Sequence, residues 1–127
     1  MFIWYFLLAS NLIIPAAMLL FGWILKNNPP QNINSAYGYR TAMSMKNTDT
    51  WIFANKLCGK IWLKTGKIML PLSIIAMLPF IHSSENIIGI VTIIILIFQC
   101  SAMILAIYFV EKQLKKKYDS YGRKRPE

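Results

Sequence analysis

Long apolar runs separated by shorter polar stretches dominate this sequence of 127 residues. The two longest runs, Phe2 to Leu25 and Ile87 to Val110, each extend over 24 positions without a charged residue. At about 1.5 Å per residue, a helix of that length spans roughly 36 Å, more than the ~30 Å hydrocarbon core of a bilayer. Each run therefore predicts one membrane-spanning helix.

A third apolar run is shorter, covering residues 68–81. It reaches a spanning length if it begins at residue 61, because Lys64 and Lys67 can extend their ammonium groups towards the lipid headgroups. Pro79 and the polar residues 82–86 then predict a tight turn into the last run. We expect a single domain, an all-α membrane protein with three transmembrane helices over residues 2–25, 61–81 and 87–110.

The polar region between the first two spans, residues 26–60, has two parts. Residues 31–45 show no sustained period and predict a loop, whereas Asn47 can cap a helix that follows. Four lysines then recur at helical spacing on one face: Lys56, Lys60, Lys64 and Lys67. Trp51, Ala54 and Cys58 fall on the opposite face, so we expect an amphipathic interfacial helix before the second span.

The basic residues follow the topology of the three spans. None precedes the first span, seven lie between Lys26 and Lys67, none lies in residues 82–86, and seven lie from Lys112 to Arg125. By the positive-inside rule, this places the N-terminus outside and the loop and the tail, residues 111–127, in the cytoplasm of a multi-pass membrane protein. The aromatic residues Trp4 and Trp23 stand where the two interfaces are expected.

The net charge of +9 is thus mainly a signal for topology and for anionic lipids. A juxtamembrane basic segment such as the tail gains about 1 kcal/mol per charge from anionic lipid. The tail residues expected to face lipid in this way are Lys115, Lys116 and Lys117. A nucleic-acid partner is not expected, since no recognisable binding motif accompanies the charge.

Polar side chains also lie inside the predicted spans. Asn11 and Gln99 both fall near the bilayer midplane, where an amide needs a hydrogen-bond partner. We therefore predict a hydrogen bond between Asn11 and Gln99, either direct or through Ser73 of the second span.

The most varied chemistry lies in residues 34–59, which read NSAYGYRTAMSMKNTDTWIFANKLCG. These residues resemble the signature of the SdpI family of bacterial immunity proteins, with its Gly-aromatic-Arg-Thr core, a Ser, an Asn and a Trp-x-x-Ala-Asn element. The motif positions are Asn34, Gly38, Tyr39, Arg40, Thr41, Ser44, Asn47, Trp51 and Asn55.

This resemblance implies a bacterial cell-membrane protein that protects its producer against a secreted peptide toxin. The best-known member of the family also signals, by holding a repressor at the membrane. The residues from Tyr37 to Asn55 would then be the functional centre. The alternative is a membrane signalling or structural partner that captures a cytoplasmic protein through its loop and basic tail, without toxin immunity.

The sequence favours a binding role over catalysis. It has a single histidine, His82, in the predicted outer turn, and its five acidic residues form no close acid–base pair. No metal site or cofactor motif is recognisable, and the two cysteines are read as small packing residues. Charged residues are absent from the predicted span interiors, which disfavours an ion pathway through one chain, although an oligomer could still build one.

Within the motif, Arg40 has two open interpretations. Its planar guanidinium can bind a carboxylate or a phosphate of a ligand, or it can set topology by contacting lipid phosphate. Trp51 is interpreted as an interfacial anchor or a packing residue in preference to a platform for a ligand. Asn55 is expected to hydrogen-bond the turn at Gly38 to Thr41 and so to shape the loop.

Overall fold

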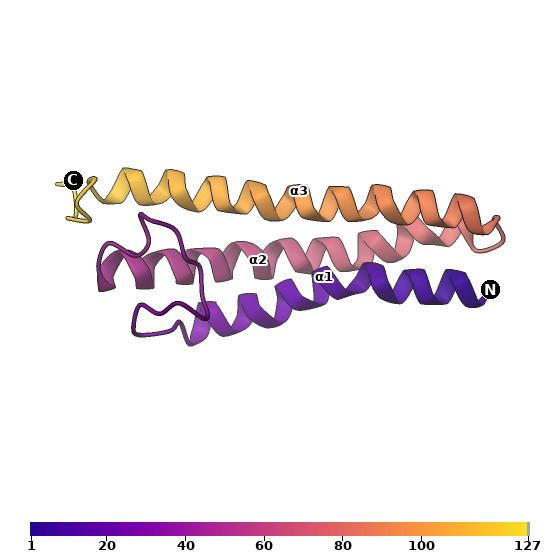
Figure 1. Ribbon diagram of the computed structural model, residues 1–127, viewed down its shortest axis with the longest axis horizontal. Coiled ribbons are helices and arrows are strands. Elements are labelled where there is room, and N and C mark those ends of the chain that lie inside the picture. Colours follow the sequence, from indigo (N-terminus) through magenta and orange to yellow (C-terminus); the bar gives the residue numbers. More distant parts are fainter. Residues whose placement is uncertain (127) are drawn as a thin grey trace.

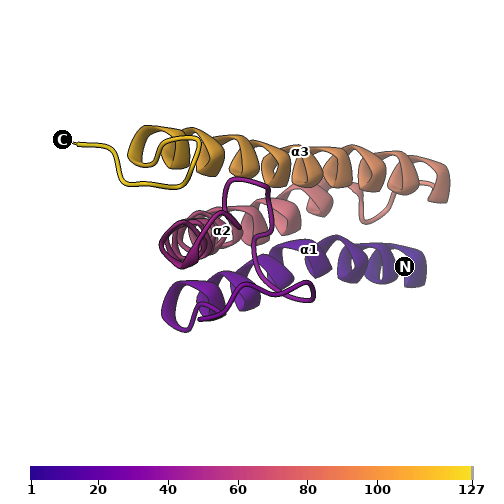
Figure 2. The same cartoon turned by 60° about the vertical axis from the view of Figure 1, so that its left-hand side comes forward.

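Three long helices account for most of the computed structural model, which describes residues 1–126. They are α1 (Phe2–Asn27), α2 (Thr48–Met77) and α3 (Glu85–Lys117), and a short 3-10 helix, η1 (Leu78–Phe80), follows α2. All three are long and apolar enough to cross a membrane, which confirms the all-α architecture with three candidate spans. Near the loop, α2 lies between α1 and α3, and the loop crosses it (Figures 1 and 2).

The interfacial helix expected before the second span is not a separate element. Its residues form the first half of α2, which runs without interruption from Thr48 to Met77. The prediction of a separate interfacial helix was wrong because its apolar face does not rest on lipid. Trp51, Ala54 and Cys58 are instead buried against the rest of the protein. The predicted face is otherwise as expected, since the four lysines of α2 are exposed. Their contact with lipid stays a prediction.

The start of α2 is fixed by local chemistry. Asn47 accepts a hydrogen bond from the backbone N–H of Thr50 through its side chain, and the Thr50 hydroxyl accepts one from the N–H of Asn47. This reciprocal capping box satisfies two N–H groups that the first helical turn leaves free. At the other end of the bundle, the Ser84 side chain accepts from Ile87 N–H and caps the start of α3.

Two glycines allow α1 and α2 to approach backbone to backbone. A Cβ on Gly59 would lie 2.5 Å from the amide nitrogen of Lys26 and 2.7 Å from the carbonyl oxygen of Gly22. A Cβ on Gly22 would lie 2.7 Å from the amide nitrogen of Leu63. Close contact through small residues is a common way for helices to associate in membranes, where lipid supplies no hydrophobic drive between them.

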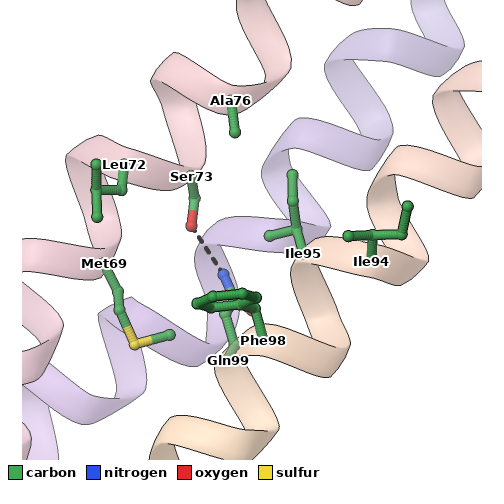
Figure 3. A pocket seen from close by; sticks show the side chains of 8 residues that line it. All are labelled: Met69, Leu72, Ser73, Ala76, Ile94, Ile95, Phe98 and Gln99. Atoms are coloured by element: carbon green, nitrogen blue, oxygen red, sulfur yellow. Dashed lines mark hydrogen bonds between the residues drawn. The ribbon is translucent and has the colours of Figure 1, made fainter.

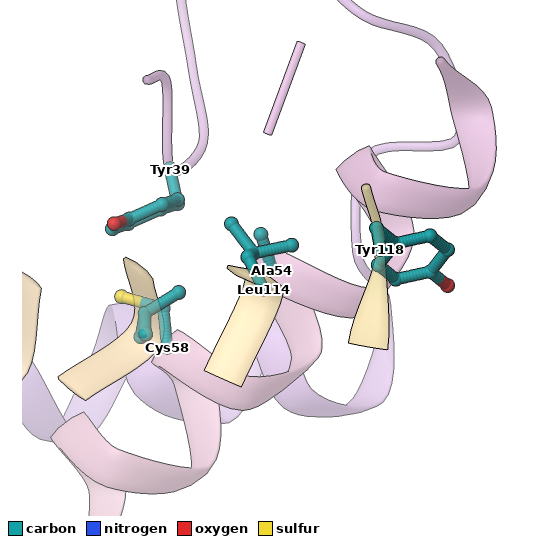
Figure 4. Close-up of a cluster of buried hydrophobic side chains, with 6 residues drawn as sticks. Tyr39, Ala54, Cys58, Leu114 and Tyr118 are labelled. Carbon is teal, nitrogen blue, oxygen red and sulfur yellow. The ribbon is translucent and has the colours of Figure 1, made fainter. Parts of the chain in front are cut away.

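The bundle has one apolar cluster near each end. Away from the loop, Trp4 and Met77 pack with Ile88 and Ile95, and the indole N–H of Trp4 donates to the carbonyl of Met77 over 2.9 Å. Beneath the loop, a second cluster joins α2, α3 and the loop (Figure 4). Its buried members are Tyr39, Ala54, Cys58, Val110, Leu114 and Tyr118.

The tail after α3 turns back towards the start of α2. Asp119 accepts hydrogen bonds from the backbone N–H groups of Tyr121 and Arg123, and Tyr118 bridges Lys124 in antiparallel fashion. The side-chain amide of Asn47 donates to the carbonyl of Gly122 over 2.7 Å. The tail and the loop region are therefore joined in one surface.

Candidate functional site: the loop cap

Residues 34–47 of the loop and the first turns of α2 form a compact structure, which we call the loop cap. Its first bend is made by Asn34, whose side-chain oxygen accepts from the backbone N–H groups of Ala36 and Tyr37. Gly38 follows with φ of 112°, in the region of backbone space that favours glycine. A Cβ at Gly38 would lie 2.7 Å from the side-chain oxygen of Asn55, so there is also no room for a side chain at this position.

Asn55 holds this bend against α2. Its side-chain oxygen accepts from Tyr39 N–H over 2.7 Å, and its amide donates to the carbonyl of Trp51 over 2.8 Å. The predicted hydrogen bond between Asn55 and the Gly38–Thr41 turn is therefore confirmed. The side chain is completely buried, so both bonds are shielded from water.

Glu111 of α3 is the residue that completes the loop cap and that sequence reasoning missed. Its carboxylate oxygen accepts from the hydroxyl of Tyr39 over 2.7 Å and from that of Thr41 over 2.6 Å. The sequence contained one signal, a carboxylate directly after an apolar span, but no indication of its partners. Burial and the hydrogen bond to Glu111 raise the pKa of Tyr39 well above its ordinary value, so the phenol stays a donor.

Ser44 and Thr50 link the second half of the loop to α2. The Ser44 hydroxyl accepts from Thr41 N–H over 2.8 Å and lies within hydrogen-bond distance of the carbonyl of Tyr39. The Thr50 hydroxyl lies 3.0 Å from the carbonyl of Ser44. Both side chains are completely buried. Thr50 was not among the predicted site residues, although its place three residues after the Asn47 cap could have revealed it.

Trp51 packs in the interior of the loop cap. Its side chain is completely buried, and its indole N–H donates to the carbonyl of Pro30 over 2.7 Å. Of the two interpretations left open, this geometry supports packing. The indole fixes the segment that leaves α1, so it positions the loop from the opposite side to Glu111.

Arg40 differs from its neighbours because it is exposed. One guanidinium nitrogen, Nη1, donates to the carbonyl of Ser35 over 2.6 Å. Within residues 1–126, the one ion pair joins Arg123 to Asp119, so no carboxylate of the described chain neutralises Arg40. The motif thus divides into buried or half-buried residues that build the loop cap and one exposed arginine.

The polar side chains of the spans meet far from the loop cap. The Gln99 amide donates to the Ser73 hydroxyl over 2.9 Å (Figure 3). It also donates to the main-chain carbonyl of Asn11 over 2.8 Å. The predicted contact between Asn11 and Gln99 is present, but through the backbone of Asn11. The side-chain amide of Asn11 and the amide oxygen of Gln99 are buried without a partner among the described residues.

Comparison with known proteins gives the family of the chain. The model of the SdpI/YfhL protein family matches residues 31–110. This range contains the whole motif from Asn34 to Asn55 and α3 as far as Val110. The chain belongs to the SdpI/YfhL protein family. It is 36% identical over 52 residues to the uncharacterized protein YfhL of Bacillus subtilis (strain 168). That alignment covers 41% of this chain and 47% of the relative, about half of its length. No solved structure matches this member of the family.

Proposed function

We propose that this SdpI-family membrane protein protects its cell against a secreted peptide toxin, with the loop from Tyr37 to Asn55 as its functional centre. The family includes immunity proteins. The observation that carries the proposal is the construction of the loop cap. Contacts to Pro30, Asn55 and Glu111 fix the motif to the segment that follows α1, to α2 and to α3, and they leave Arg40 exposed at its surface.

The role is one of binding, without a chemical reaction, in the bacterial cell membrane. We propose that the N-terminus lies outside and that the loop and tail face the cytoplasm, because the basic residues gather on that side. Thiol labelling of intact cells tests this orientation in a background with Cys58→Ala and Cys100→Ser. An impermeant reagent should label Asn86→Cys and should leave Ala42→Cys unlabelled; both positions are exposed. The opposite pattern would place the loop outside.

A toxin-survival assay tests the proposed function directly. The chain is expressed in a sensitive bacterium, which is then exposed to candidate peptide toxins of the secreted type. Parent cells should survive, whereas Arg40→Lys cells should lose protection at unchanged membrane abundance, because lysine keeps the charge and loses the planar fork. Full protection by Arg40→Lys would remove Arg40 from the recognition role. A Lys46→Gln variant, altered in the same loop at an exposed position, is the matched control.

A second candidate function is capture of a cytoplasmic protein without immunity. It is favoured by the hydrogen bond between Asn47 and Gly122, which joins the loop and the basic tail in one surface. Deletion of residues 119–127, which leaves Tyr118 of the apolar cluster in place, separates the two proposals. Immunity through the loop should survive this deletion, whereas co-purification of a cytoplasmic partner should be lost.

A further inference from the structure

A pocket of about 520 Å³ lies between the loop and the three helices. Its volume falls in the range of about 300–1,000 Å³ that is typical of small-molecule sites. Residues 36–41 of the loop form one wall. The helical side chains that form the others are Phe21, Leu25, Cys58, Trp62 and Ile107.

Two of these walls continue onto the outer surface of the bundle. Phe21 on α1 is 43% exposed and Ile107 on α3 is 44% exposed. Both belong to the uncharged runs that face lipid in a membrane-embedded chain. Since the same side chains line the pocket and the lipid surface, an apolar chain can enter from the bilayer between α1 and α3.

The pocket also offers positive charge and hydrogen-bond donors. Arg40 lines it and has no carboxylate partner among residues 1–126, while Ser35 engages only one of its guanidinium nitrogens. Trp62 lines it as well, and its indole N–H is buried without an acceptor in the described chain. A guanidinium binds phosphate well because its N–H groups match the spacing of phosphate oxygens.

The aromatic-belt rule leads us to expect the pocket at the depth of the headgroups. Trp23, the aromatic residue expected at this interface, is 53% exposed and stands between Phe21 and Leu25. An apolar cleft with an arginine at this depth matches a molecule that carries an acyl chain and an anionic head. In a bilayer that description fits an anionic phospholipid, and a soluble phosphate would leave the apolar walls unused.

We propose that the pocket binds one anionic phospholipid from the leaflet on the loop side. The phosphate contacts Arg40, and an acyl chain lies between Phe21 and Ile107. The bound lipid fills the space between α1 and α3 that the loop alone leaves open. The lipid site shares Arg40 with the proposed recognition of a toxin. Lipid retention is measured without a toxin, so either proposal can fail while the other holds.

Native mass spectrometry of the full-length chain in detergent tests the proposal. Phosphatidylglycerol and phosphatidylcholine with identical acyl chains are added in turn, and the fraction of protein that retains one lipid is measured. The parent should retain phosphatidylglycerol about tenfold more tightly, because both lipids carry a phosphate but the choline cation of phosphatidylcholine neutralises it and repels Arg40. Arg40→Gln should abolish this preference, and Lys46→Gln, which removes a charge from the same loop outside the pocket, should preserve it.

A second pair of variants tests the apolar walls and does not depend on Arg40. Ile107→Trp fills the pocket and should lower retention of both lipids. Ile104→Trp should not lower it, because Ile104 of the same helix is 64% exposed and does not line the pocket. Equal retention of the two lipids by the parent would overturn the proposal. Displacement of bound lipid by soluble glycerol phosphate would also overturn it, because the site would then recognise phosphate alone.

Discussion

Asn55 and Asn11 are both asparagines with no exposed surface, yet they occupy opposite environments. Asn55 in the loop cap uses its oxygen for Tyr39 N–H and its amide for the carbonyl of Trp51. Asn11 in the middle of the bundle contributes only its backbone carbonyl, to Gln99, and both polar atoms of its side chain lack a partner within residues 1–126.

The difference shows where the polar chemistry of this protein is organised. In the loop cap, irregular backbone offers N–H and C=O groups that side chains can satisfy, so burial of a polar side chain is compensated. In the middle of a span, the helical backbone N–H groups are already paired, so a buried amide depends on side chains of other helices or on the second lone pair of a helical carbonyl, as Gln99 does. Replacement of a buried polar residue should therefore destabilise the loop cap, whereas the same replacement in the bundle interior should be tolerated.

Removal of the Glu111 carboxylate should have the largest effect. Glu111→Leu removes the acceptor of the Thr41 hydroxyl and leaves the Tyr39 hydroxyl only its longer contact of 3.3 Å to the carbonyl of Ile107, at about 1–3 kcal/mol for each part-buried group. We expect the free energy of unfolding in detergent to fall by about 3 kcal/mol. Glu111→Gln keeps an acceptor oxygen and should cost about 1 kcal/mol, and Glu85→Leu at the exposed start of α3 should cost less still. Equal effects of the Glu111→Leu and Glu85→Leu variants would contradict the assignment.

Gly38→Ala should follow in size. The substitution combines a backbone conformation that costs about 1–3 kcal/mol outside glycine with a Cβ placed 2.7 Å from the Asn55 oxygen. We expect a loss of about 2 kcal/mol in thermal or chemical unfolding. Gly89→Ala is the matched control, because a Cβ at this helical glycine meets nothing within 4 Å. That variant should be neutral or stabilising by up to about 1 kcal/mol.

Replacement of each of the two asparagines by leucine should change the free energy of unfolding in opposite directions. Asn11→Leu replaces unpartnered polar atoms with an apolar side chain of similar size and should stabilise the bundle by about 1 kcal/mol. Asn55→Leu breaks two buried hydrogen bonds and should destabilise it by about 2 kcal/mol. Unfolding of both variants in the same detergent checks the comparison. A destabilised Asn11→Leu protein would show that the midplane amide has a structural partner.

The smallest expected effect is confined to the tail. Hydrogen bonds from the backbone of Arg123 and Tyr121, together with the Arg123 charge, lower the pKa of Asp119 below its ordinary value of 3.8. Because the folded pKa is the lower one, the stabilisation is present above pH ~4 and is lost as the pH falls through the folded pKa. The protection factor for amide exchange at Arg123 should therefore fall in acid, and Asp119→Asn should remove this pH dependence. An unchanged protection factor between neutral and acid pH would contradict a stabilising role of Asp119 in the tail turn.

Several features were predictable because they depend on residues close together in the sequence. Uncharged runs of spanning length predict α1 and α3, and Asn47 predicts the start of α2. The motif around Gly38 and Asn55 also pointed to the loop, and to the hydrogen bond between that turn and Asn55. Hydropathy, helix capping and short motifs are local properties, so a single sequence contains them.

Only the tertiary structure decided the remaining features. The amphipathic segment from Thr48 continues into the second span because the loop and α3 cover its apolar face, and no local pattern distinguishes such cover from a lipid surface. Glu111 accepts from Thr41 across 70 positions of the sequence, and Gln99 reaches the backbone of Asn11 across 88. These pairings depend on how the helices lie beside one another, since a buried polar group takes whichever partner the packing brings within reach.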